Sequence, residues 1–144
     1  NGPIVFTMFR GHWWPYCNAE LYALQELYQE FAAKDATIVA LSPQAIAFRS
    51  QMVDSHSLSF DLLGDPGNEF ASKLGLRFTL PDELIPIYRS LGIDLPACNG
   101  DDSWSLPIPA RILIATTGEI IDVNADPDYT VRPEPLDTLA LLEW

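Results

Sequence analysis

Positive charge is scarce in this chain, which has 8 lysine and arginine residues against 20 aspartate and glutamate residues and a formal net charge of −12 at pH 7. The few basic residues form no cluster along the sequence. Nucleic acid is densely negative and would be repelled by such a surface. We therefore expect no nucleic-acid partner, and the simplest explanation of the acidity is that it keeps the protein in solution.

Cysteine is also scarce, since Cys17 and Cys98 are the two thiols among 144 residues. Two cysteines do not make the dense disulfide framework of a small secreted protein, so they are either redox-active or inert. A structural zinc site is not indicated, because there is no close cysteine pair and His12 and His56 are isolated. We expect no metal.

Long apolar runs are missing as well. No stretch approaches the roughly twenty apolar residues that a membrane helix needs, so no membrane partner is expected. The chain opens with Asn1, Gly2 and Pro3 directly before a strand-like run, without an initiator methionine or a signal-like segment. We therefore expect that a natural N-terminal segment is missing, and we take the cytoplasm as the expected location.

The remaining pattern is that of a globular α/β protein. Apolar residues make up 48% of the chain, and residues 1–144 are interpreted as a single domain with its own core. Apolar runs predict strands at residues 4–9, 37–41, 60–63, 111–115 and 119–123, the last two forming a hairpin. Helical spacing and capping residues predict helices at residues 18–34, 43–54, 68–74, 81–91 and 135–143, with residues 95–107 irregular.

The alternation of strands and helices predicts a central mixed β-sheet with helices on both faces. Cys17 lies between the first strand and the first helix, which places it at the sheet edge where α/β proteins have their active sites. At the start of a helix, backbone N–H groups and the helix dipole favour the thiolate over the thiol. Cys17 is therefore a candidate nucleophile, and the alternative is an inert core cysteine.

The stretch FRGHWWPYC at residues 9–17 resembles the Phe-Tyr-Arg-Gly-x-Trp-Cys-Pro-Tyr-Cys signature of a peroxiredoxin-like subgroup. Supporting matches are LGDPG at 63–67, FASKLG at 70–75, IPA at 108–110, and Asp128, Tyr129 and Arg132. On these motifs the chain is similar to the alkyl hydroperoxide reductase / thiol-specific antioxidant superfamily. The resemblance implies a thioredoxin-like fold and the activity of a peroxiredoxin, an antioxidant oxidoreductase with a redox-active cysteine.

One departure from the signature gives two possible alignments, because Trp14 replaces its first cysteine. In the peroxiredoxin register, Thr-x-x-Cys, Cys17 is the peroxidatic residue and Trp14 stands at the threonine position. In the thioredoxin register, Cys-x-x-Cys, Trp14 has replaced the attacking thiol and Cys17 is only its partner. The rest of the chain is more similar to the peroxiredoxins, so we favour the first register.

The resemblance and the local sequence together suggest further site residues. Arg10 is the basic residue nearest to Cys17 in sequence and could stabilise the thiolate and the departing oxygen. Its alternative role is a structural ion pair. Arg111 lies near the start of a strand where peroxiredoxins carry an arginine, although strict alignment puts that position on Pro109. The same resemblance makes Pro109 the cis-proline of thioredoxin-like folds, packed beside the cysteine.

Further expectations concern the neighbours of the thiol. Trp14, Pro15 and Tyr16 would line the pocket. Glu20 is expected to cap the start of the helix. Cys98 lies in the segment before the hairpin and could resolve a Cys17 sulfenate as a disulfide, or it is a bystander.

These observations predict a thiol-dependent peroxidase that reduces hydrogen peroxide or small organic hydroperoxides through Cys17 without metal or organic cofactor. The resemblance implies a thiol reductant such as thioredoxin or glutathione, and a homodimer. Two alternatives stay open. One is a thioredoxin-like disulfide oxidoreductase, which the loss of the paired cysteine disfavours. The other is a non-catalytic binding or regulatory domain on the same fold, with Trp14 as the mark of lost activity.

Overall fold

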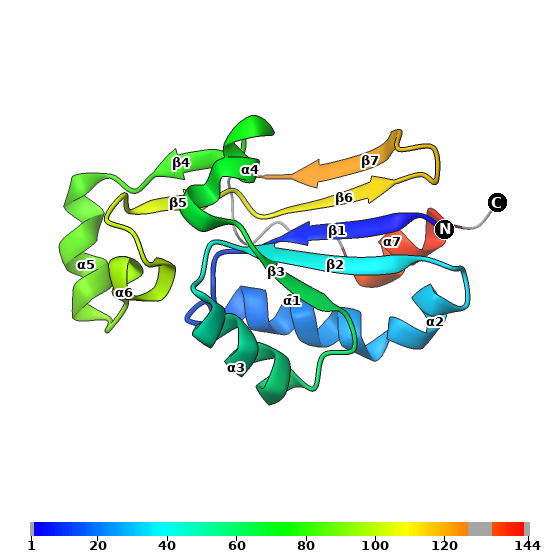
Figure 1. Cartoon of the computed structure of the whole chain (residues 1–144), viewed down its shortest axis with the longest axis horizontal. Coiled ribbons are helices and arrows are strands. Elements are labelled where there is room, and N and C mark those ends of the chain that lie inside the picture. The colour runs from blue at the N-terminus through cyan, green and yellow to red at the C-terminus, as the bar shows by residue number, and fades with distance from the viewer. Residues whose placement is uncertain (1, 127–133, 143–144) are drawn as a thin grey trace.

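The computed structural model describes residues 2–126 and 134–142 (Figure 1). Its main feature is a five-stranded sheet with the strand order β3-β2-β1-β6-β7. The strands are β1 (Ile4–Met8), β2 (Thr37–Ser42), β3 (Asp61–Gly64), β6 (Ala110–Ile114) and β7 (Ile120–Ala125). β1, β2 and β3 are parallel, whereas β6 is antiparallel to β1 and β7 is antiparallel to β6, so the sheet is mixed as the sequence predicts.

The larger part of the core lies on one face of this sheet. The helices that cover it are α1 (Pro15–Glu26), α2 (Tyr28–Ala32), α3 (Ile46–His56) and α7 (Pro135–Ala140). Val5 of β1 and Ile38 of β2 pack there against Leu24 of α1 and Met52 of α3, in one buried apolar cluster. α1 and α3 lie on the same face because each connects two parallel strands by a right-handed crossover in the same direction along the sheet.

The opposite face is covered by the short helix α4 (Glu69–Lys73). Ala71 of α4 packs there against Met8 of β1, Leu41 of β2 and Ala110 of β6. The helix is preceded by the 3-10 turn η1 (Pro66–Asn68), and the Asp65 carboxylate accepts the backbone N–H groups of residues 70 and 71 at 2.9 and 3.0 Å. Both faces are therefore covered by helices, which confirms the predicted sandwich.

A smaller unit stands beyond the end of β1 and is called the satellite unit below (Figure 1). Its elements are β4 (Arg77–Thr79), η2 (Asp82–Leu84), α5 (Ile85–Ser90), α6 (Leu95–Asn99) and β5 (Ser105–Pro107). β4 and β5 form a separate antiparallel two-stranded sheet. The unit has its own buried cluster, to which Leu80, Ile93, Leu95, Trp104 and Leu106 contribute.

Several predicted boundaries are wrong. Residues 95–107 are not irregular, because Asp94 caps α6 with a bond from Ala97 N at 3.4 Å, and β5 pairs with β4. Ser42 does not begin a helix; it ends β2 opposite Gly64, and α3 begins only at Ile46. The predicted helix at 18–34 starts earlier and is divided at Leu27 into α1 and α2.

The hairpin of β6 and β7 is confirmed, with both strands within a residue or two of the predicted bounds. The helix predicted at 135–143 is present as α7. The motif residues Asp128, Tyr129 and Arg132 lie outside the described residues. Within the described part of the chain, no helix combines the length and apolar character needed to span a membrane.

Candidate active site

Cys17 lies in the first turn of α1, directly beyond the carboxyl end of β1. A turn closed by Trp14 N on Gly11 O at 3.2 Å and Pro15 at the start of the helix redirect the chain from strand to helix. The Cys17 side chain has no solvent exposure, and its Sγ accepts the backbone N–H of Arg10 at 3.4 Å. The thiol therefore has a backbone donor and the start of a helix beside it, both of which favour negative charge on sulfur.

The segment before the helix, residues 9–14, is called the cysteine loop below. Its anchor is His12, whose backbone N–H donates to Gln44 Oε1 at 2.9 Å and whose Nδ1 lies 2.5 Å from the same oxygen. The His12 ring also stacks on Phe48 of α3, with centroids 4.8 Å apart. Asn18 Nδ2 donates to His12 O at 2.8 Å, and His56 Nε2 lies 3.0 Å from Asn18 Oδ1. These contacts tie the loop to α3.

Sequence reasoning missed this anchor, because it treated His12 and His56 as isolated and assigned no role to Gln44. The bonded partners are separated by 32 and 38 residues along the chain. No local motif signals contacts of that range. A polar residue just after the second parallel strand was the one available hint, since the carboxyl ends of β1 and β2 meet at the same sheet edge.

Arg10 contacts the thiol through its backbone N–H. Its side chain is buried, with 6% exposure. The guanidinium Cζ lies 5.8 Å from the centre of the Trp14 ring and 5.2 Å from that of Phe78 in β4. Arg10 thus connects the cysteine loop with the satellite unit, and its charge lies over two aromatic rings at distances favourable for cation–π contacts.

Arg111 of β6 is held by Glu20, which lies one helical turn beyond Cys17 in α1. Its Nη2 donates to Glu20 Oε1 at 2.6 Å and its Nη1 donates to Thr138 Oγ1 at 3.2 Å, and its side chain is 2% exposed. Thr7 Oγ1 donates to the same Glu20 oxygen at 3.3 Å. Glu20 is therefore the acceptor of a buried ion pair. The predicted helix-capping role of Glu20 is wrong, because α1 starts at Pro15 and its first turn contains no acidic residue.

The predicted pocket residues have different environments. Trp14 is partly buried and packs against the main core, with its ring centre 5.5 Å from that of Trp13. Pro15 and Tyr16 are exposed at the first turn of α1, so they face the surface. Pro109 is buried directly before β6. The expected cis bond there is wrong, since no peptide bond in the described residues is cis and a trans X–Pro bond is the more stable form.

Cys98 is buried in α6, and the structure records both cysteines as free thiols. Its carbonyl accepts Ala45 N at 2.8 Å, so α6 packs against the same loop after β2 that holds His12. Burial of the thiol, followed by the nearby negative charge of Asp94, raises the pKa of Cys98. A raised pKa lowers the thiolate fraction at neutral pH and makes Cys98 a slower nucleophile than a free cysteine.

We therefore expect Cys98 in the Cys17→Ser variant to alkylate with iodoacetamide along a pH profile whose midpoint lies above the value of about 8.5 for an exposed cysteine. The Asp94→Asn change should lower that midpoint because it removes the negative charge, while asparagine retains the capping group of α6. Mass spectrometry of the alkylated protein between pH 6 and pH 10 measures both midpoints. A midpoint at or below that of a cysteine peptide would contradict the expectation.

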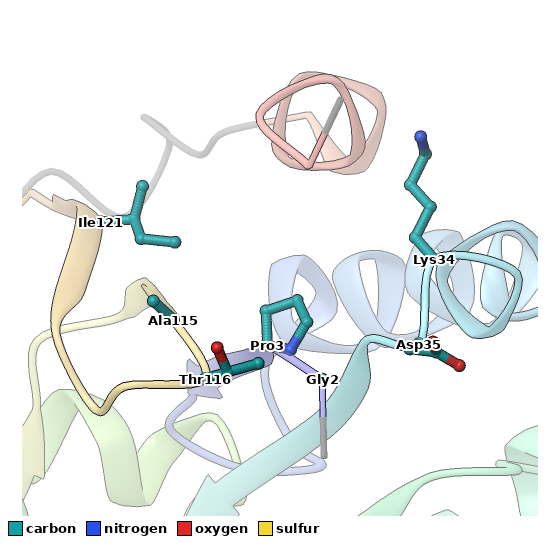
Figure 2. Close-up of a pocket in the computed structure, with 7 residues that line it drawn as sticks. All are labelled: Gly2, Pro3, Lys34, Asp35, Ala115, Thr116 and Ile121. Carbon is teal, nitrogen blue, oxygen red and sulfur yellow. The ribbon is translucent and has the colours of Figure 1, made fainter. Parts of the chain in front are cut away.

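One cavity among the described residues lies away from the cysteine. Its volume is about 490 Å³. Figure 2 shows its lining residues at the opposite edge of the sheet, where β1 begins and β6 ends. It is lined by Gly2, Pro3, Lys34, Asp35, Ala115, Thr116 and Ile121. A second cavity, of about 390 Å³, begins at Arg10 beside the cysteine loop and extends along the satellite unit. Proximity to Cys17, rather than size, therefore makes the second cavity the relevant one.

The chain is similar to known proteins over most of its length. Residues 1–123 match the model of the AhpC/TSA family. A curated relative from Mycobacterium tuberculosis, Rv1608c, whose name assigns it provisionally to the peroxiredoxins, is 24% identical over 90 residues. That alignment covers 62% of this chain and 58% of the relative, so the chain spans less than two thirds of the relative's length.

Solved structures show the same fold. The peroxidoxin BcpB from Mycobacterium tuberculosis superposes with a TM-score of 0.73 at 18% identity, covering 99% of this chain and 79% of that one. Reduced Prx3 from Vibrio vulnificus, solved in complex with hydrogen peroxide, gives a TM-score of 0.75 at 16% identity, covering 99% of this chain and 78% of the other. At these identities the similarity establishes the thioredoxin-like fold of the peroxiredoxins.

Proposed function

The chain belongs to the AhpC/TSA family, and from this premise we propose that it is a thiol-dependent peroxidase that reduces hydrogen peroxide or small organic hydroperoxides through Cys17. The observation that carries the proposal is the position of the Cys17 thiol, in the first turn of α1 and within 3.4 Å of the Arg10 N–H. The resemblance of residues 9–17 to a peroxiredoxin-like signature also supports Cys17 as the reacting sulfur.

The proposed reaction uses the sulfur as nucleophile. The Cys17 thiolate attacks the distal oxygen of the hydroperoxide, an S–O bond forms, the O–O bond breaks, and the leaving alkoxide or hydroxide takes a proton to become an alcohol or water. The sulfur is thereby oxidised to a sulfenic acid and the peroxide is reduced. The Arg10 side chain, buried at the end of the cysteine loop, would stabilise the charge that develops on the oxygens.

Access to the thiol requires movement, because the Cys17 side chain is fully buried. We propose that the first turn of α1 opens, since its outer residues Pro15 and Tyr16 already face solvent. Short surface segments of this kind open at a free-energy cost well below that of global unfolding. Burial combined with Trp14 at the threonine position also supports the second candidate, a non-catalytic binding domain on the same fold.

Reduction of the Cys17 sulfenic acid back to the thiol needs an external thiol reductant such as thioredoxin or glutathione. The sulfenic acid condenses with one reductant thiol to form a mixed disulfide and water, and a second thiol releases Cys17 and a disulfide. In the alternative route Cys98 supplies the first thiol. The raised pKa of Cys98 disfavours that route at neutral pH, so we propose a one-cysteine cycle. A homodimer and a single domain over residues 1–144 also remain part of the proposal.

Intact-protein mass spectrometry after one equivalent of hydrogen peroxide tests the function. Fully reduced protein should gain one oxygen, which peptide mapping should locate at Cys17, faster than free cysteine oxidises under the same conditions. Loss of two hydrogens instead would show that Cys98 resolves the sulfenate. Oxidation no faster than that of free cysteine would contradict the peroxidase and favour the non-catalytic domain.

A further inference from the structure

The cavity that begins at Arg10 is built by the satellite unit and is called the Phe78 cavity below. Its volume of about 390 Å³ lies at the lower end of the range for small-molecule sites. The lining residues are Arg10, Phe78, Leu80, Pro81, Leu84, Tyr88 and Ile108. Arg10 is the one charged residue among them, and the others are apolar or aromatic. The cavity therefore suits an apolar group with a polar end directed toward Arg10.

The walls of this cavity differ in exposure. Leu80, with 3% exposure, belongs to the buried cluster of the satellite unit, and Phe78 and Tyr88 pack partly buried against that cluster. Pro81 and Leu84 are exposed, so the cavity is open to solvent on their side. Leu84, which is 36% exposed, thus stands where a larger side chain would narrow the space without disturbing the core.

Two contacts connect the Phe78 cavity to the cysteine loop. The first is Arg10, which belongs to the loop and also lines the cavity. Its backbone N–H reaches Cys17 Sγ, and its guanidinium lies 5.2 Å from the Phe78 ring centre. Trp13 of the loop meets Tyr88 edge to face, with ring centres 5.8 Å apart, and packs against the satellite cluster. The two aromatic walls of the cavity therefore contact the segment that positions the thiol.

We propose that the Phe78 cavity binds the aromatic group of an aryl-substituted hydroperoxide, and that Leu84 limits the size of the group that fits. This inference rests on the function proposed above. A phenyl group would pack against the rings of Phe78 and Tyr88, a contact worth more than its buried area alone. The hydroperoxide end would then point toward Arg10 and the cysteine loop, and the reaction would release the matching aryl alcohol.

The test compares cumene hydroperoxide with hydrogen peroxide, using the second-order rate constant for Cys17 oxidation by each. We expect the unaltered protein to prefer cumene hydroperoxide, and the Leu84→Trp variant to lower the cumene-to-hydrogen-peroxide ratio at least about tenfold, because the indole occupies the cavity. Leu91→Trp is the matched control, since Leu91 is 68% exposed at the end of α5 and does not line the cavity.

Equilibrium binding gives a second measurement that needs no turnover. Cumyl alcohol, the product of cumene hydroperoxide reduction, should shift the NMR signals of Phe78 and Tyr88 saturably, and Leu84→Trp should abolish that shift. If hydrogen peroxide oxidises Cys17 but Leu84→Trp changes the ratio no more than Leu91→Trp, the cavity inference is overturned while the peroxidase stands. If hydrogen peroxide fails to oxidise Cys17, the peroxidase falls, and saturable alcohol binding or its absence decides whether the cavity takes aromatic ligands.

Discussion

Replacing Cys17 with serine is expected to lower the rate of peroxide reduction by at least about 1,000-fold, because the change removes the nucleophile on which the whole reaction depends. Serine is the smallest change that does so. It leaves an acceptor atom near the position of Sγ, to which the Arg10 N–H at 3.4 Å can still donate. The measurement is hydrogen peroxide consumption in the presence of excess dithiothreitol, with the unaltered protein as reference.

Cys98→Ser provides the matched control for this experiment. Cys98 is also a buried cysteine, with 8% exposure, and it lies in α6 of the satellite unit, outside the cysteine loop. Under a one-cysteine cycle with an external thiol, Cys98→Ser should retain peroxide consumption within about twofold. Thermal unfolding of both variants separates loss of chemistry from loss of fold. Peroxide consumption that survives in Cys17→Ser but not in Cys98→Ser would reverse the assignment of the nucleophile.

The sheet and its main helices could be predicted because their signals are local. The sequence has apolar runs at β1, β2, β6 and β7, and turn-forming residues between β6 and β7 indicate the hairpin. The satellite unit was harder to predict. β4 and β5 contain three residues each, too few to show a period, and they pair across the whole of η2, α5 and α6. Their pairing depends on contacts between distant parts of the chain, which a short stretch of sequence does not reveal.

In the site, too, local features could be predicted from the sequence and long-range contacts could not. The position of Cys17 between strand and helix follows from local pattern, whereas the partners of its neighbours do not. Glu20 has the spacing of a helix-capping residue if the helix begins at Asn18, but Pro15 starts the helix three residues earlier. The carboxylate then faces the sheet instead of the helix start. Its partner Arg111 lies 91 residues away, so the ion pair could not be read from spacing.

The second large effect is expected at this ion pair. Glu20→Ala should lower the free energy of unfolding by about 3–5 kcal/mol, because it leaves the buried Arg111 guanidinium without the carboxylate that it now binds at 2.6 Å. For a chain of 144 residues this corresponds to a fall in Tm on the order of 10 °C. Urea unfolding followed by circular dichroism measures the change. Glu26→Ala, at an exposed position of the same helix, should stay within about 0.5 kcal/mol.

A double-mutant cycle then distinguishes an ion pair from simple packing at this position. Combining Glu20→Leu with Arg111→Met removes both charges and fills similar volume, so the double variant should be more stable than either single variant. That outcome would show that the single variants lose stability because each leaves one buried charge without its partner. If the two single effects simply add, the pair is not coupled, and α1 is held to the sheet by its apolar contacts alone. Because Glu20 lies one turn beyond Cys17, a coupled pair also fixes this part of α1 to the sheet.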